Sequence, residues 1–443
     1  MSNLSQKPWL PRTHSPSIFL TDCSIVDPES GEVHSNRTIH IQHGKIALIT
    51  ASTSPDEHNL DKSSPSIKLS GLFVCPGLID SHVHLTAVAG QSGMKELYAN
   101  SPNVIAYRTV HNAKKMLLRG FTTVRDTGGA DFALKEAIAE CLIPGPRLFI
   151  SGRALSQTGG HADLRQPWQG SSFKCCGGPD QPSFGRVCDG VPECLVAARD
   201  ELRQGADFLK IMVGGGVSSP SDPLEMLQFT AEEIRAITTT ASQMGKIVTA
   251  HAYTNQAIRH AIDNGVRGIE HATFIDRDTA QLCKAKNVYV TPTLVTYEAM
   301  SRAPYEEFLP ESGRKKNIEV RDRGRQSLKI LSAAGVNLCF GSDLLGGMQP
   351  LQHEEFTVRS RELSALSILR SATINPAKML GMEGKLGVVK PGGIADLLIL
   401  DFDPLKNIRG FANFEKSGRA IIKDGRVVMS RVSELKVDKV YQL

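Results

Sequence analysis

Two histidines, His82 and His84, lie one residue apart directly after an apolar run, in the stretch VCPGLIDSHVHL at residues 74–85. Successive side chains of a β-strand point to opposite faces, so residues separated by one position share a face. Two imidazoles on one face at the end of a strand either bind a metal ion together or are unrelated core histidines. This stretch alone leaves both interpretations open.

Four more groups of metal-ligand type are predicted to end strands. Lys210 lies in FLKIMVGGG, His251 in VTAHAY, His271 in IEHATF and Asp343 in CFGSD. If these strands run parallel around a barrel, their carboxyl ends form one rim and the side chains converge. The chain has 13 histidines, which chance would scatter. A convergent metal site is therefore favoured over a set of unrelated core groups.

Lys210 is the unusual member of this set. A protonated ammonium group has no lone pair and cannot bind a metal ion. Burial beside cations favours loss of the proton, and the free amine can then add carbon dioxide. The product is a carbamate, an anionic group whose two oxygens can bridge two metal ions. The alternative is a core lysine paired with an acidic side chain.

The segments around these residues predict an α/β fold. From residue 74 to residue 363, apolar strand-like runs alternate with segments of helical length, and we count eight such β–α steps. Eight is the number in a (β/α)8 TIM barrel, whose strands are buried on both faces. An open, doubly wound sheet is the alternative. The polar, glycine-rich loop at residues 154–190 follows the third strand, at the end where barrel active sites are built.

Short alternating strands are predicted at both ends of the chain, in SIFLTDCSIVD and TIHIQHGKIALIT near the start and in GRAIIKDGRVV near the finish. The simplest packing joins residues 17–73 and 384–443 into one small β-sandwich-like domain. Residues 74–383 would then form the barrel between these two parts. The sequence thus predicts two structural units, one of which is built from both chain ends.

Charge and hydropathy limit the partners of the protein. The formal net charge of +5 is small for 443 residues, and basic residues are interleaved with acidic ones, so no nucleic-acid partner is expected. No apolar run reaches about 18 residues, and the first residues do not resemble a signal peptide. We therefore expect a cytoplasmic protein without a membrane partner, and we expect a homo-oligomer.

The nine cysteines are an odd number and are scattered, which is typical of reduced thiols in a cytosolic protein. Four of them cluster in a glycine- and proline-rich stretch, namely Cys175, Cys176, Cys188 and Cys194. Their spacing does not match paired CxxC motifs. Free thiols in a loop are therefore favoured over a zinc site or a disulfide, and the sequence does not reveal what this loop does.

Taken together, the motifs resemble the amidohydrolase superfamily, which contains metal-dependent hydrolases on a (β/α)8 barrel flanked by a β-domain. The similarity is carried by PGLIDSHVHL at 76–85, FLKIMVGGG at 208–216, the His251 and His271 strand ends, FGSDLLGG at 340–347 and the tail ATINPAKMLGMEGKLGVVKPGGIADLLILD at 372–401. The lysine-bridged binuclear branch is the most similar. It includes prolidase-like Xaa-Pro and Xaa-Arg dipeptidases and fungal ochratoxinases, which cleave an amide next to a free carboxylate.

The resemblance implies two divalent metal ions, with zinc as the expected metal, although the spacing does not exclude manganese, cobalt or iron. The ligands it implies are His82, His84 and Asp343 for the first ion, His251 and His271 for the second, and carbamylated Lys210 as the bridge. A hydroxide between the two ions would attack the carbonyl carbon of the amide. Asp343 would pass the proton of that hydroxide to the leaving nitrogen, so Asp343 and Lys210 are the expected catalytic residues.

Two residues are expected to bind substrate. His161 lies in TGGHAD within the long loop, and Tyr253 follows His251 by two positions and shares its face of the strand. A solvated loop histidine and a structural tyrosine are the alternatives. In RDTGG, Arg125 is expected to be a structural partner, with Asp126 as a group that orients a metal ligand as the alternative.

The expected function is hydrolysis of the amide of a dipeptide or an N-acyl amino acid, including ochratoxin-like amides. A lyase or decarboxylase with the same metal ions is the first alternative, and a non-catalytic amidohydrolase-like scaffold is the second. The cysteine-rich insert GSSFKCCGGPDQPSFGRVC departs from the dipeptidase pattern and puts the dipeptide specificity in doubt. The sequence does not identify the leaving group.

Overall fold

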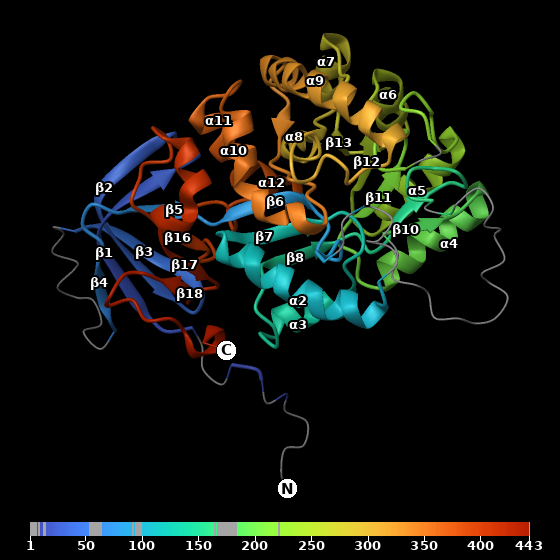
Figure 1. Cartoon of the computed structure of the whole chain (residues 1–443). Coiled ribbons are helices and arrows are strands. Elements are labelled where there is room, and N and C mark those ends of the chain that lie inside the picture. The colour runs from blue at the N-terminus through green and yellow to red at the C-terminus, as the bar shows by residue number, and fades with distance from the viewer. Residues whose placement is uncertain are drawn as a thin grey trace, which may run out of the picture.

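The computed structural model describes residues 7, 9–11, 15–52, 64–90, 93, 100–163, 165, 184–219 and 222–442. Within these ranges the chain has a mixed α/β fold with one eight-stranded, one seven-stranded and one three-stranded sheet (Figure 1). Cys175 and Cys176 lie outside the described residues. No helix in the described ranges is long and apolar enough to cross a membrane.

Strands from both ends of the chain lie in one sheet, in the order β18-β17-β16-β5-β1-β2-β3, with β4 paired to β1 (Figure 1). The strands are β1 (Ile18–Asp27), β2 (Glu32–Gln42), β3 (Lys45–Ala51), β4 (Ser66–Lys68), β5 (Phe73–Pro76), β16 (Leu397–Leu400), β17 (Gly418–Lys423) and β18 (Arg426–Ser430). The two ends meet where β5 pairs with β16, in a register that joins Pro76 to Leu397 and Phe73 to Leu400. Apolar residues on these strands pack into one core cluster, so the sheet is held by burial as well as by its hydrogen bonds.

Parallel strands form the other two sheets, in the orders β10-β9-β11-β12-β13-β14-β15 and β6-β7-β8. The strands are β6 (Leu78–Val83), β7 (Phe121–Asp126), β8 (Arg147–Ile150), β9 (Ala154–Ser156), β10 (Gly185–Val187), β11 (Leu209–Met212), β12 (Val248–Ala252), β13 (Gly268–His271), β14 (Tyr289–Thr291) and β15 (Asn337–Leu338). Strands β6, β7, β11, β12 and β13 are buried at every position, as expected for a parallel sheet covered on both faces.

Helices alternate with the parallel strands (Figure 1). The α-helices are α2 (Pro102–Leu118), α3 (Phe132–Ala139), α4 (Gly190–Arg203), α5 (Ala231–Gln243), α6 (Asn255–Asp263), α7 (Arg277–Ala285), α8 (Leu294–Ala299), α9 (Glu311–Ala333), α10 (Glu354–Arg359), α11 (Ala365–Ser371), α12 (Ile374–Met379) and α13 (Phe414–Ser417). The 3-10 helices are η3 (Gly346–His353), η4 (Ile408–Asn413) and η5 (Lys439–Tyr441). Helix α5 is an example of how the local sequence forms a helix. Thr230 and Glu233 form a capping box at its start, and Ile234 and Ile237 lie on its buried face.

Two predicted strand ends were wrong. Lys210 is the second residue of β11, because Ile211 and Met212 continue the pairing with β12. Asp343 does not end a strand either, because β15 stops at Leu338. After the pairing with β14 ends, the amide of Phe340 donates instead to the Ser371 carbonyl at 2.7 Å. Asp343 therefore lies in the loop that leads to η3.

The chain passes from the first sheet to the parallel strands at Gly77, between β5 and β6. A Cβ atom at this position would lie 2.1 Å from Thr122 Oγ1, so only glycine fits the close approach to β7. The predicted boundary at residues 73 and 74 falls inside β5. The division of the chain into a barrel and a β-domain stays a prediction.

The cysteines of the described ranges are free. The sulfur atoms of Cys188 and Cys194 are 3.8 Å apart, which is well beyond the length of a disulfide bond. The contact with the Cys188 thiol and, after it, burial raise the pKa of Cys194 far above its usual value, so this thiol stays protonated. Free thiols at these two positions agree with the sequence-based expectation, but Cys194 lies in α4 and not in a loop.

Truncation tests how much the chain depends on its last strands. A chain that ends at residue 383 lacks β16 to β18, leaves the edge of β5 unpaired and exposes apolar side chains that pack against Leu398 and Phe411. We expect it to aggregate, measured by size-exclusion chromatography. A chain that ends at residue 438 keeps all three strands and is the control, expected to stay soluble. A soluble and active 383-residue product would contradict this expectation.

Candidate functional site

His82, His271 and Asp343 come together at the carboxyl ends of the parallel strands. Each offers one ligand-type atom, and these atoms lie within 4.8 Å of one another. His82 comes from β6, His271 is the last residue of β13, and Asp343 lies in the loop after β15. His84 joins them from just beyond β6, and its Nε2 atom lies 3.4 Å from Asp343 Oδ1. Residues far apart in the sequence thus share one buried cluster.

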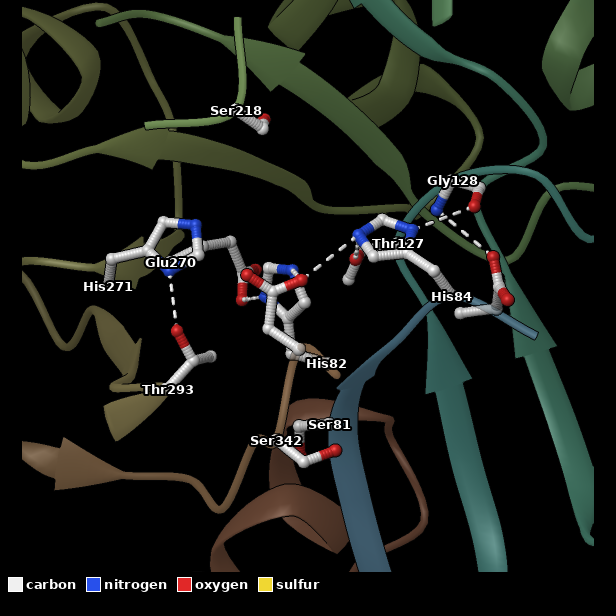
Figure 2. Close-up of polar contacts among 12 residues, drawn as sticks. Ser81, His82, His84, Thr127, Gly128, Ser218, Glu270, His271, Thr293 and Ser342 are labelled. Carbon is white, nitrogen blue, oxygen red and sulfur yellow. Dashed lines mark hydrogen bonds and ion pairs between the residues drawn. The ribbon is translucent and has the colours of Figure 1, made fainter. Parts of the chain in front are cut away.

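Three of these imidazoles are oriented by a hydrogen bond at Nδ1, as Figure 2 shows. The Nδ1 contacts are His82 to Glu270 Oε2 at 2.8 Å, His84 to the Gly128 carbonyl at 2.9 Å, and His271 to Thr293 Oγ1 at 2.7 Å. With Nδ1 engaged, the Nε2 atom of each ring remains for a metal ion. This arrangement, with the outer nitrogen held by an oxygen, is typical of metal-binding histidines.

The electrostatics of the cluster also suit a cation. Burial lowers the pKa of His82 to about 4, so its imidazole is neutral near pH 7 and keeps a free lone pair. Burial alone would raise the pKa of Asp343, but the nearby imidazoles of His82 and His84 outweigh burial and hold that pKa well below its usual range. His84 differs from His82, because burial lowers its pKa but the hydrogen bond to Asp343 outweighs burial and raises that pKa. A neutral imidazole at His82 beside an ionised carboxylate belongs to the donor set that zinc and similar divalent ions prefer.

His251 lies beside the cluster but outside its closest group. Its ring centroid is 4.7 Å from that of His271, and it stacks on the ring of His161 at 4.2 Å. Its Nε2 atom contacts the Gly215 carbonyl at 3.1 Å, which leaves Nδ1 for another partner. Since His271 groups with His82 and Asp343, the predicted assignment of His251 and His271 to a second metal ion stays a prediction.

Lys210 is buried in the wall of the same cavity. Burial lowers the pKa of its amine to about 8, although Glu270 and Asp343 act in the opposite direction. More of the amine is therefore unprotonated near neutral pH than in an ordinary lysine. An unprotonated lysine amine has the lone pair that reaction with carbon dioxide requires.

The cavity has a volume of about 90 Å³ and holds both residues predicted to bind substrate, His161 and Tyr253, in its wall. His161 Nδ1 contacts Asp222 Oδ2 at 3.1 Å. The hydroxyl groups of Tyr253 and Tyr297 lie 2.8 Å apart. All six predicted metal ligands line the same cavity. The sequence analysis missed Asp222 and Tyr297, because neither has a fixed spacing to the histidine or tyrosine it contacts.

A family comparison decides what kind of protein carries this site, because the pattern of the amidohydrolase family matches residues 73–428. The chain belongs to the amidohydrolase family. Ochratoxinase from Aspergillus niger is 28% identical over 421 residues, which cover 92% of this chain and 86% of that protein.

Solved structures agree with this assignment. A prolidase solved with N-methylphosphonate-L-proline is similar at a TM-score of 0.88 with 38% identity, covering 94% of this chain and 100% of the prolidase chain. A Xaa-Pro dipeptidase with bound methionine is similar at a TM-score of 0.81 with 29% identity, covering 93% and 99% of the two chains. This amidohydrolase is therefore a hydrolytic enzyme that acts on C–N bonds.

Glu270 is the main residue of the amidohydrolase site that sequence analysis missed. It is fully buried, and its Oε1 atom accepts a hydrogen bond from Arg125 Nη2 at 2.5 Å while Oε2 holds His82. Arg125 also donates from Nε to the Ser81 carbonyl at 2.6 Å, so it is the structural partner that the sequence predicted. An acidic residue next to His271 in the apolar strand GIEH was the signal available in the sequence.

Asp126 fixes the backbone that follows His84. Its carboxylate accepts hydrogen bonds from the backbone amides of Leu85 at 2.7 Å and Gly128 at 3.0 Å. The Gly128 carbonyl is in turn the acceptor that contacts His84 Nδ1. Asp126 therefore positions His84 through the backbone. This geometry supports the alternative role predicted for Asp126, which is to orient a metal ligand.

The Arg125–Glu270 pair should be important for stability. In Arg125→Met the carboxylate of Glu270 is left buried beside His82 without its cation, so we expect the free energy of unfolding to fall by about 3–5 kcal/mol. Chemical denaturation measures this change. Arg203→Met is the control, because Arg203 pairs with Asp200 at the exposed surface and such pairs contribute about 0–1 kcal/mol. Equal losses in both variants would contradict the expectation.

Proposed function

We propose that this enzyme uses divalent metal ions to hydrolyse an amide bond next to a free carboxylate, as in a dipeptide or an N-acyl amino acid. The observation that carries the proposal is the buried group of His82, His271 and Asp343, which faces a cavity shared with Lys210 and His161. The similarity to an ochratoxinase and to a prolidase solved with a proline-containing compound supports the choice of substrate class.

The proposed metal ligands follow from the donor atoms around the cavity. His82, His84 and Asp343 would hold one ion, His251 and His271 a second, and carbamylated Lys210 would bridge the two, with zinc as the expected metal. When bound, such ions polarise the amide carbonyl and lower the pKa of a water molecule. The Nδ1 contacts of three imidazoles, which leave their Nε2 atoms on the side of Asp343 or the cavity, support this assignment.

Asp343 is the proposed proton carrier. Its depressed pKa keeps the carboxylate ionised near neutral pH, so it can accept a proton from the attacking water molecule. The side chain is 18% exposed, whereas that of His82 is 2% exposed, so Asp343 is the more accessible of the two from the cavity. It would then deliver the proton to the amide nitrogen, which is a poor leaving group until it is protonated.

His161 and Tyr253 are the proposed contacts to the substrate. Asp222 holds Nδ1 of His161, which leaves the opposite ring nitrogen facing Ser218 Oγ at 3.4 Å in the cavity wall. Burial raises the pKa of Tyr253 well above its usual value, so its hydroxyl keeps its proton and can donate to a carbonyl or carboxylate oxygen. Tyr297 orients that hydroxyl from the other side.

We also propose that the parallel strands close into a (β/α)8 barrel over residues 74–383, with residues 17–73 and 384–443 as the β-domain. Hydrogen bonds at both edges of the three-stranded sheet, β6 and β8, support closure of the barrel. The amide of Ser81 in β6 donates to the Phe340 carbonyl at 2.7 Å, and the amide of Asp207 donates to the Ile150 carbonyl of β8 at 2.7 Å. The cytoplasmic location and the homo-oligomer stay predictions.

A substrate screen with the purified full-length enzyme tests the proposed function. Dipeptides and N-acyl amino acids should release an amine and an acid, and matched compounds whose carboxylate is converted to a carboxamide should react far more slowly. Metal content per chain is measured alongside. Release of carbon dioxide instead of an amine would favour the decarboxylase alternative. A metal-free protein that gains no activity on addition of zinc would favour the non-catalytic alternative.

A further inference from the structure

A second cavity lies apart from the candidate active site. Its volume is about 570 Å³, compared with about 90 Å³ for the first cavity, and the two share no lining residue. The wall is built from three regions of the chain: helix α2, the 3-10 helix η3, and the C-terminal segments around α13 and β18. It therefore lies where the C-terminal strands of the first sheet meet the helices around the parallel strands.

Positive charge dominates this second cavity. Lys115, Arg119 and Arg431 line it together with His111, while Glu415 is the one carboxylate among its described lining residues. Within the described part of the chain, none of these groups takes part in an ion pair. Glu415 and the buried Asp80 favour the charge of Arg119. Lys115 and Arg431, however, are exposed at the cavity without a described carboxylate within ion-pair distance, so positive charge remains in excess and an anion inside the cavity would be attracted.

Arg119 shows most clearly that a partner is missing. Its Nε atom donates to Gln352 Oε1 at 2.9 Å, but its Nη2 atom is buried and has no hydrogen-bond partner among the described residues. Buried polar groups without a partner are rare in folded proteins and call for an explanation, such as a bound ion.

A simpler explanation accounts for two of the three cations, because Arg119 is the C-cap residue of α2. Lys115 lies in the last turn of α2, where a positive charge is stabilised by the free carbonyls at the helix end. Arg431 follows β18 and is not at a helix end; its guanidinium donates to the carbonyl of Gly418. Helix-end electrostatics therefore do not explain why Arg431 lies at the same cavity as Lys115 and Arg119.

The cavity also has an apolar side. Leu118, Phe414 and Met429 line it, and Phe414 packs in the hydrophobic core while Leu118 and Met429 are half-buried. We propose that this second cavity binds a small organic anion. Its carboxylate or phosphate group would contact Lys115 and Arg431 beside Arg119. Its apolar part would lie against Leu118, Phe414 and Met429.

Binding to the full-length enzyme tests the proposal, with phenyl phosphate and benzoate as probes measured by isothermal titration calorimetry. The double variant Lys115→Gln and Arg431→Gln removes two charged donors that are not part of the candidate active site. We expect the dissociation constant of the preferred probe to rise about ten- to hundredfold, while amide hydrolysis is unchanged. The tighter of the two probes shows whether the site prefers phosphate or carboxylate.

A matched control separates this site from the general effect of net charge. Arg199→Gln and Lys284→Gln remove the same two charges from exposed positions on α4 and α7, so probe binding should not change. Thermal unfolding verifies that both double variants are folded. The proposal is overturned if neither probe binds the unaltered enzyme, if the cavity variant binds as tightly as the unaltered enzyme, or if the control weakens binding equally.

Discussion

Asp343→Asn should give a folded enzyme whose turnover is lower by roughly 10²–10⁴-fold, the usual contribution of general acid–base catalysis. An asparagine keeps the shape and one oxygen of the side chain, but an amide cannot accept and release the proton. Metal content should therefore fall only partly, while the turnover number falls much more. Steady-state kinetics and metal analysis on the same preparation measure the two effects separately.

Asp278→Asn is the matched control for this experiment, because Asp278 lies at an exposed position in the first turn of α7. Its turnover should match that of the unaltered enzyme. Turnover in Asp343→Asn within a factor of ten of normal, with full metal content, would show that another group moves the proton. His161 would then be the first alternative, because it lies in the wall of the same cavity.

Lys210→Ala should remove the proposed bridge between the metal ions and most of the activity. Residues that merely orient metal ligands usually contribute 10–100-fold to metal affinity or activity, so loss of a bridging ligand should exceed ~10²-fold. Short carboxylic acids such as acetate should restore part of the activity, because a carboxylate has the same pair of oxygens as the carbamate. Kinetics with and without acetate measure the loss and the rescue.

A labelling experiment tests the carbamate independently of activity. Enzyme equilibrated with ¹³C-labelled carbon dioxide should show a carbamate carbon resonance that is absent in Lys210→Ala. Lys286→Ala is the matched control, since Lys286 is exposed at the end of α7 and should leave the resonance and the activity unchanged. Full activity and two metal ions per chain in Lys210→Ala would exclude the carbamate bridge.

The strand pattern was enough to predict which residues meet at the site. His82 and His84 follow from the period of a strand, and parallel strands bring Lys210, His251 and His271 to one cavity. The position of each residue along its strand was less predictable. Lys210 lies deeper than expected because β11 continues past it, and such details depend on how far the neighbouring strand β12 extends.

The groups that hold the ligands were not predictable from the pattern. Glu270 contacts His82 across 188 residues of sequence, and Asp222 contacts His161 across 61. These contacts depend on the register between strands and on the path of loops, which alternation of apolar and polar residues does not encode. The second cavity was equally hidden, because Lys115 and Arg431 are brought together only by the packing of α2 near the C-terminal strands.

The pairing of β5 with β16 has a consequence for biosynthesis. The register partners Pro76 and Leu397 are separated by 321 residues (397 minus 76), and a ribosome that adds 5–20 residues per second needs about 15–60 s to make that stretch. Throughout this time one edge of β5 has no strand to pair with. The nascent chain must therefore be shielded by chaperones or delay assembly of its first strands until translation is nearly complete. A ribosome that stalls before β16 releases a product with an open sheet edge, which is a substrate for protein quality control.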